Sequence, residues 1–144
     1  MKLKQISLFV ENRPGALNAP CQCLADAGIS ISTLTLADTK NFGVLRLLIR
    51  DWEKAAEILS GHGFMVKLVD VVAIEIDHKP GSLAKVLDVF GRNGINVEYL
   101  YAFPAGVNGR AVIIFRFDDP EAALVKLKAE PGLVIVDHES LFAE

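Results

Sequence analysis

The sequence predicts an α+β protein made of two tandem copies of one unit, with elements in the order β-α-β-β-α-β in each copy. Two observations predict this. The segment VENRPGALNA at residues 10–19 returns as IDHKPGSLAK at residues 76–85. In each copy, apolar residues alternate with polar ones, then switch to helical spacing, and then alternate again. The 144 residues suffice for two small domains, which we place at residues 1–70 and 71–144.

The repeat keeps a constant spacing over many positions. The residues that match at a spacing of 66 are Pro14 and Pro80, Gly15 and Gly81, Leu17 and Leu83, and Gly28 and Gly94. Toward the end of each copy the spacing changes slightly, which places a small insertion near the second helix. A duplicated unit explains this pattern better than chance.

Each copy opens with a strand that has one face on a core, at residues 4–10 and 71–76. A helix follows each Pro-Gly. The apolar stripes expected on these two helices are Leu17, Pro20, Cys21 and Leu24 in the first copy and Leu83, Val86, Leu87 and Phe90 in the second. Gly28 and Gly94 end these helices. Pro20 should kink or delay the first helix, because proline lacks one backbone donor.

The remaining elements also come in matching pairs. Residues 29–36 with 43–50, and residues 95–103 with 110–117, are expected to form two hairpins. Second helices are expected from Asp51 and from Asp119, both suited to the N-cap position. The last strands are placed at residues 64–69 and 133–136.

This order of elements is the ferredoxin-like split motif, in which the third strand lies between the first and the second. The second strand is then an unpaired edge, which is a liability. A single copy of about 70 residues is marginal alone. We therefore expect the copies to cover each other's edges and to form a continuous antiparallel sheet, with helices packed on one face.

Composition excludes several classes of protein. The formal net charge of -3 and the absence of a basic run argue against a partner that is nucleic acid. No apolar run approaches the roughly 18 residues of a membrane span, and the first residues are too polar for a signal peptide. We expect a cytoplasmic protein. Cys21 and Cys23 point to nearly opposite sides of a helix, so they cannot easily share a metal or form a disulfide.

The two Pro-Gly turns suggest a binding site. Proline fixes φ for the turn, and glycine lets another group approach closely. The amides at residues 16–17 and 82–83 then begin a helix, where unpaired N–H groups and the helix dipole suit a carboxylate. Alternatively, the turn is only a tight connection, and water or the side chains of Asn12 and Asp77 bind these amides.

VENRPGAL followed by LADAGISI, and IDHKPGSL followed by FGRNGINV, resemble the ACT domain, a ferredoxin-like module in the regulatory parts of amino-acid metabolic enzymes. The resemblance covers nearly the whole chain, as two tandem copies without a catalytic domain. It implies that domains pair through their sheet edges and that a free amino acid binds between them, held by the loop after the first strand.

The resemblance also implies the site residues. In the two loops they are Asn12, Arg13, Pro14, Gly15, Ala16, Leu17, Asp77, His78, Lys79, Pro80, Gly81, Ser82 and Leu83. Weaker candidates for the opposite wall are Ile31, Ser32, Thr33, Asn96, Val97 and Glu98. Arg13 and Lys79 could instead be solvated charges on the rim. Because Pro20 disturbs the first helix, we expect the second copy to hold the better-formed site.

These observations favour a regulatory protein that binds a free amino acid, forms a homodimer, needs neither cofactor nor metal and is not an enzyme. No G-x-S-x-G or H-E-x-x-H motif indicates catalysis. Nothing in the spacing of Asp77, His78, Asp137 and His138 fixes a metal site, and no helix-turn-helix segment indicates a DNA-binding regulator. The main alternative is a free-standing regulatory subunit that docks on a biosynthetic enzyme without a ligand of its own.

Overall fold

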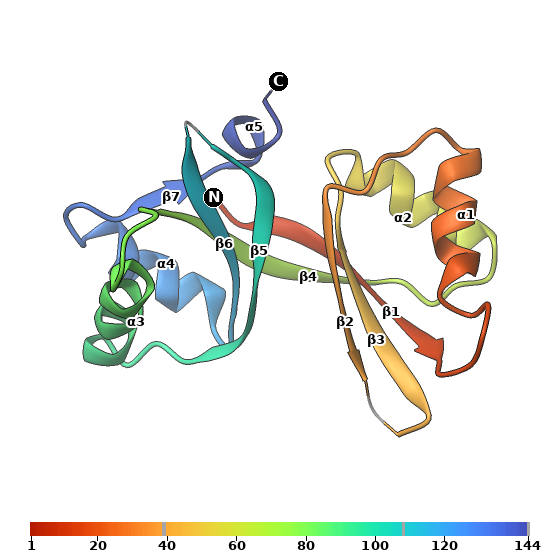
Figure 1. Ribbon diagram of the computed structural model, residues 1–144, viewed down its shortest axis with the longest axis horizontal. Helices are drawn as coiled ribbons and strands as arrows, with labels where there is room; N and C mark the ends of the chain where they lie inside the picture. The colour runs from red at the N-terminus through yellow and green to blue at the C-terminus, as the bar shows by residue number, and fades with distance from the viewer. Residues whose placement is uncertain (39, 108, 144) are drawn as a thin grey trace. The chain divides into compact units, whose positions relative to one another are not determined.

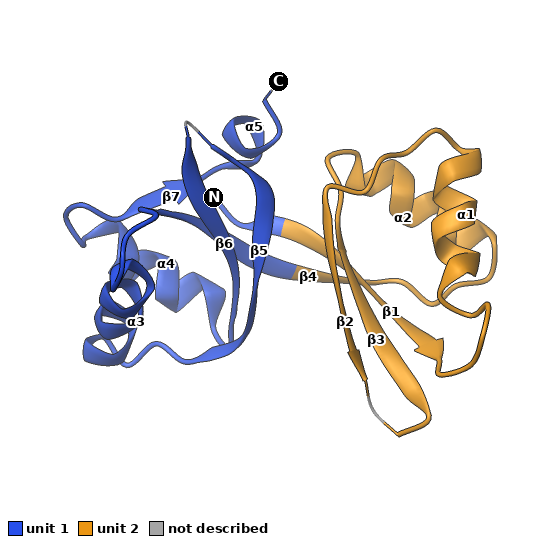
Figure 2. Ribbon diagram, in the orientation of Figure 1, with its two compact units in different colours: residues 1–3, 70–144 blue, residues 4–69 orange. Residues whose placement is uncertain are grey.

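The computed structural model describes residues 1–38, 40–107 and 109–143 (Figure 1). The chain divides into two compact units, residues 4–69 and residues 1–3 together with 70–144 (Figure 2). In each unit, two helices lie on one face of a small antiparallel sheet. None of the helices in the described part of the chain has the length and apolar character needed to cross a membrane.

The unit of residues 4–69 contains the first half of the repeat. Its elements are β1 (Leu3–Glu11), α1 (Asn18–Asp26), β2 (Thr33–Asp38), β3 (Phe42–Leu48) and α2 (Trp52–Gly61). Strand β3 pairs antiparallel with both β1 and β2. The third strand of the repeat therefore lies between the first and second, as the split motif predicts.

Alternating residues of β1 build the core of this unit. Ile6, Leu8 and Val10 are buried, and Ile6 and Leu8 lie opposite Leu47 and Leu45 of β3. The two helices complete this core with Leu24, Ala55 and Leu59. The alternation predicted for residues 4–10 is confirmed for the apolar face of the strand.

Helix α1 begins late, as Pro20 predicts. It starts at Asn18, whereas the helix of the second copy starts at Ser82, the match of Ala16. Pro20 then occupies the first turn of α1, where a missing N–H costs no helical hydrogen bond. The expected stripe is partly wrong: Leu17 is exposed before the helix, and Cys23 packs against the core in place of Cys21.

The other unit contains the complete second half of the repeat. Its elements are β4 (Lys67–Ile76), whose first three residues belong to the other unit, α3 (Ser82–Arg92), β5 (Val97–Val107), β6 (Arg110–Phe117), α4 (Pro120–Lys128), β7 (Val134–Val136) and α5 (His138–Leu141). Strand β6 lies between β4 and β5, and β7 pairs with β4. The α+β class and the ferredoxin-like order of elements are confirmed.

Three phenylalanines form the centre of the core in this unit. The ring of Phe90 on α3 meets Phe115 and Phe117 of β6 edge to face, at centroid distances of 5.0 and 5.1 Å. Helix α4 adds Ala123, Leu124 and Leu127, as predicted. Leu87 was expected in the stripe of α3, but it is 38% exposed because the core lies on the side of Val86 and Phe90.

The last strand of the first copy and the end of the second copy differ from the prediction. The separate strand expected at residues 64–69 is wrong, because β4 begins at Lys67 and continues without interruption into the second copy. No glycine or proline stands between Phe64 and Ile76 to end the strand. The short helix α5 was not predicted. Asp137 begins it by accepting a hydrogen bond from the amide of Ser140 at 2.8 Å.

Candidate functional site

The turn between β4 and α3 is shaped by one glycine. Gly81 has φ of 85° and occupies the N-cap position of α3, and Gly15 in the first copy has φ of 84°. A Cβ at either glycine would meet no atom within 4 Å. The left-handed backbone of each turn therefore favours glycine, and no other part of the protein fills the space where a Cβ would lie.

The turn uses some of the amides that were expected to be free. The amide of Ser82 donates to the carbonyl of Lys79 at 3.1 Å, and that of Ala16 donates to Arg13 at 3.3 Å. The expectation is wrong for these two residues, because each turn closes on itself. No side chain caps α3, so its next amides, at Leu83 and Ala84, remain the donors that a helix start leaves without an intrahelical partner.

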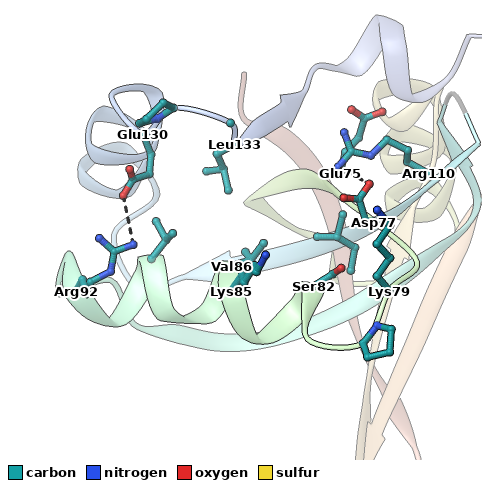
Figure 3. A pocket seen from close by; sticks show the side chains of 15 residues that line it. Glu75, Asp77, Lys79, Ser82, Lys85, Val86, Arg92, Arg110, Glu130 and Leu133 are labelled. Atoms are coloured by element: carbon teal, nitrogen blue, oxygen red, sulfur yellow. Dashed lines mark ion pairs between the residues drawn. The ribbon is translucent and has the colours of Figure 1, made fainter.

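A cavity of about 420 Å³ lies beside this turn (Figure 3). The end of β4, one side of α3 along its whole length, the start of β6 and the loop between α4 and β7 form its walls. Of the residues expected at the site, Asp77, Lys79, Pro80 and Ser82 line this cavity. His78, Gly81 and Leu83 belong to the same turn without lining it.

Charged side chains of both signs converge in the cavity. At one end, Nη2 of Arg110 lies 3.2 Å from Oδ1 of Asp77, and Glu75 stands next to this pair (Figure 3). At the other end, Arg92 contacts Glu130 at 3.8 Å. Lys79 and Lys85 line the space as well. Such a lining suits a small ligand that carries both a positive and a negative group.

The end with Arg110 holds two polar atoms without partners. Glu75 is 9% exposed, and its Oε1 has no hydrogen-bond partner among the described residues. Nε of Arg110 is also buried and, within the same part of the chain, unpaired. Buried polar atoms are nearly always hydrogen-bonded. Here Oε1 of Glu75 lacks a donor, and Nε of Arg110 lacks an acceptor.

Sequence reasoning missed Glu75, Arg110, Arg92 and Glu130. Glu75 reads as an ordinary polar position of an alternating strand, and Arg110 begins β6, far along the chain from the turn. The antiparallel pairing of Ile76 with Ala111 brings Arg110 beside Asp77. Recognising this from the sequence would have required the register of β4 and β6, which the turn residues do not indicate.

The first copy differs from the second at its turn. Asn12, Arg13, Pro14 and Gly15 are exposed, and Arg13 pairs with the carboxylate of Glu11. The amide of Asn12 donates to the carbonyl of Asn41 at 3.0 Å, which attaches the turn to the β2–β3 hairpin. A more open hollow of about 700 Å³ follows α1 and α2 and includes Gly15, without a comparable cluster of charges.

Three residues expected at the opposite walls have other surroundings within their own units. Ile31 packs against the core of its own unit, and Val97 does the same in the other unit. Asn96 is exposed, and its carbonyl accepts a hydrogen bond from the amide of Asp118 at 3.4 Å. None of these three residues lines the cavity beside the turn after β4.

His78 and His138 lie on separate segments of the same unit. His138 lies in α5, with its ring 4.7 Å from that of Phe142, while His78 is exposed on the turn. Over residues 1–38, 40–107 and 109–143, no group of three or more His, Cys, Asp or Glu side chains could hold a metal ion.

The fold and the turn define a protein of two tandem ferredoxin-like units with a ligand-sized cavity. The chain belongs to the ACT domain pair family, whose sequence profile matches residues 1–142. The resemblance to the ACT domain is thus confirmed. A search of curated proteins gave no match.

Solved structures share this fold. The structure of protein BT0572 from Bacteroides thetaiotaomicron is 33% identical, with a TM-score of 0.90, and the alignment covers 100% of this chain and 98% of that one. The regulatory subunit of aspartate kinase from Thermus thermophilus, in a ligand-free form, is 20% identical with a TM-score of 0.61, over 88% of both chains. The corresponding subunit from Thermus flavus is 22% identical with a TM-score of 0.59, over 88% of this chain and 90% of that one.

Proposed function

We propose that the protein is a non-catalytic regulator of amino-acid metabolism that binds a free amino acid in the cavity beside residues 77–83. Membership of the ACT domain pair family and the fold shared with regulatory subunits of aspartate kinase support a regulatory role. The observation that carries the proposal is the convergence of both signs of charge in a cavity of about 420 Å³ beside α3.

The common part of an amino acid fits the groups at this helix start. Its carboxylate would lie at the positive end of the helix dipole of α3, beside Ser82 and Lys79, which both line the cavity. Its ammonium group would donate to Asp77. A carboxylate has about four lone-pair sites, so Asp77 can bind the ligand while it keeps Arg110. Such charge-assisted bonds are about twice as strong as neutral ones.

Binding would regulate by changing how the protein associates. A ligand that fits one arrangement better than another shifts the population toward it, by no more than the difference in affinity. We propose a homodimer whose association with itself or with a catalytic partner enzyme depends on the amino acid, and a cytoplasmic location. Neither a cofactor nor a metal takes part in this mechanism.

A second candidate is a subunit that docks on a biosynthetic enzyme without a ligand of its own. Exposed apolar side chains on one unit favour it: Phe9 on β1 is 73% exposed, and Leu34 and Leu36 on β2 are 49% and 47% exposed. Exposed apolar groups of this kind are typical of surfaces that meet another protein.

A thermal-shift screen against the free amino acids separates the two candidates. A ligand at 100 times its dissociation constant adds about 2.7 kcal/mol of stability, which is a shift of several degrees for a small domain. We expect such a shift with at least one amino acid. Asp77→Ala should abolish it, whereas Asp38→Ala, at an exposed aspartate of the other unit, should not.

Three other results of these experiments would contradict the proposed function. If no amino acid raises the melting temperature at millimolar concentration, amino-acid binding is wrong and the docking subunit becomes the better candidate. If Asp38→Ala abolishes the shift and Asp77→Ala does not, the ligand binds elsewhere in the chain. Turnover of an added compound would contradict the non-catalytic role.

A further inference from the structure

We infer that Glu75 and Arg110 recognise the side chain of the bound amino acid, and that this side chain carries a neutral hydrogen-bonding group, first of all a carboxamide. The inference rests on the proposed function, because it takes an amino acid in the same cavity as given. It adds the class of ligand, which the groups at the helix start cannot select because they would contact only the part common to all amino acids.

The unpaired atoms of these two residues indicate a missing partner. Oε1 of Glu75 and Nε of Arg110 are both buried, and neither has a hydrogen bond to any described residue. Both residues line the cavity, at the same end (Figure 3). A buried polar atom without a hydrogen-bond partner is costly, so natural proteins rarely keep one unless it has a use. Two such atoms at one end of a cavity point to a ligand group.

The register of the sheet places Glu75 and Arg110 on neighbouring strands as a diagonal pair. Glu75 lies opposite Val112, and Ile76 lies opposite Ala111, so Arg110 stands beside Asp77 at the end of the ladder. Its Nη2 is held by Asp77 at 3.2 Å. Long side chains can reach across such a diagonal, yet Oε1 of Glu75 and Nε of Arg110 make no hydrogen bond to each other. Each residue therefore has one atom that can bind a group of the ligand.

The two atoms together select one chemistry. A cationic side chain would satisfy Glu75 but would stand against Arg110, while a carboxylate would satisfy Arg110 but would face Glu75. An apolar side chain would leave both atoms unpaired. A carboxamide donates from its NH₂ to Glu75 and accepts through its oxygen from Arg110. A hydroxyl can do both through a single oxygen, which makes serine and threonine the second choice.

The side chain of Glu75 can reach such a ligand. Its Oε1 is screened from solvent in this structure, although the residue lines the cavity. The last torsion of a glutamate side chain is broad and roughly two-fold, so the carboxylate turns at little cost. The volume of about 420 Å³ also lies in the usual range for a small-molecule site.

Isothermal titration calorimetry on the full chain tests this inference with L-glutamine, L-asparagine, L-glutamate, L-aspartate, L-threonine and L-leucine. We expect a carboxamide amino acid to bind about tenfold or more tightly than its acid counterpart and than leucine, since one lost hydrogen bond in a buried site costs about this factor. Serine-type hydroxyl ligands, represented by threonine, would fall between them.

Glu75→Gln should reverse this preference. A glutamine at this position offers an NH₂ donor and removes the negative charge, so the acid counterpart should gain affinity while the carboxamide loses about tenfold. A purely structural role of Glu75 would change the melting temperature without exchanging the preferred ligand. Glu57→Gln, the same chemical change at an exposed site on α2, should leave all affinities unchanged.

Should Glu75→Gln fail to fold, Arg110→Lys provides a second variant. Lysine keeps a positive charge near Asp77 but loses the planar Nε donor, so carboxamide affinity should fall about tenfold while leucine affinity changes little. If amino acids bind but neither variant alters their order of affinity, the inference is overturned and the proposed function stands. If no amino acid binds the unmodified chain, both are wrong.

Discussion

Nη2 of Arg110, at the start of β6, lies 3.2 Å from Oδ1 of Asp77, the residue directly after β4. This ion pair connects the end of one strand to the start of its neighbour, at the point where the chain turns into α3. Both side chains are partly exposed, so the pair positions the turn more than it stabilises the fold. The cavity beside α3 therefore has one wall whose charges can change without loss of the core.

Removing this ion pair should have little effect on stability. Asp77→Ala is expected to lower the free energy of unfolding by less than about 1 kcal/mol, because exposed ion pairs contribute at most about that much. Urea denaturation followed by circular dichroism measures the change. A loss of more than about 2 kcal/mol would mean that Asp77 has a structural role beyond the contact with Arg110.

The two aspartates at the starts of α2 and α4 should differ when they are replaced. Asp119 accepts a hydrogen bond from the amide of Ala122 at 3.1 Å, whereas the side chain of Asp51 makes no such bond and lies 3.5 Å from Arg50. Asp119→Ala should cost about 1 kcal/mol, as the loss of an N-cap usually does. Asp51→Ala should cost clearly less in the same denaturation experiment, and equal losses would contradict the difference.

Phe90 should be the most sensitive residue of α3. Its ring is buried and contacts Phe115 and Phe117, so Phe90→Ala is expected to lower the free energy of unfolding by about 3 to 5 kcal/mol. Leu87→Ala, on the exposed side of the same helix, should cost less than about 1 kcal/mol. Thermal melts of both variants measure the two losses of stability. A larger loss for Leu87→Ala than for Phe90→Ala would contradict the prediction.

Lowering the pH should destabilise α5. The hydrogen bond from the Ser140 amide to Asp137 lowers the pKa of this carboxyl group below its ordinary value of 3.8. Because the folded pKa lies below the unfolded one, the cap stabilises α5 above the unfolded pKa, and this contribution disappears as the pH falls through the folded pKa. Hydrogen exchange at the Ser140 amide should therefore accelerate relative to its intrinsic rate in this range.

Asp137→Asn provides the control for α5. Asparagine caps a helix about as well as aspartate but does not titrate, so the variant should keep the protection of the Ser140 amide in acid. If the amide loses its protection at the same pH in both proteins, the release has another cause than the protonation of Asp137.

The elements of the fold were predictable because their signals are local. Alternation at Ile6, Leu8 and Val10 places one face of β1 on a core, and the Pro-Gly before Ser82 marks the change from strand to helix. Local signals failed where two elements join without a breaker. Strand β4 runs through the boundary between the copies because no residue there ends it.

The sequence by itself determined the duplication, the order of elements in each copy, and the turns at Gly15 and Gly81, since periodicity and a left-handed glycine depend on neighbours along the chain. The tertiary structure alone decided which charges meet. Arg110 reaches Asp77 and Glu75 through the register of β6 against β4, and Glu130 reaches Arg92 through the packing of α4 and α3. Those contacts depend on how strands align and helices pack, which spacing along one chain does not specify.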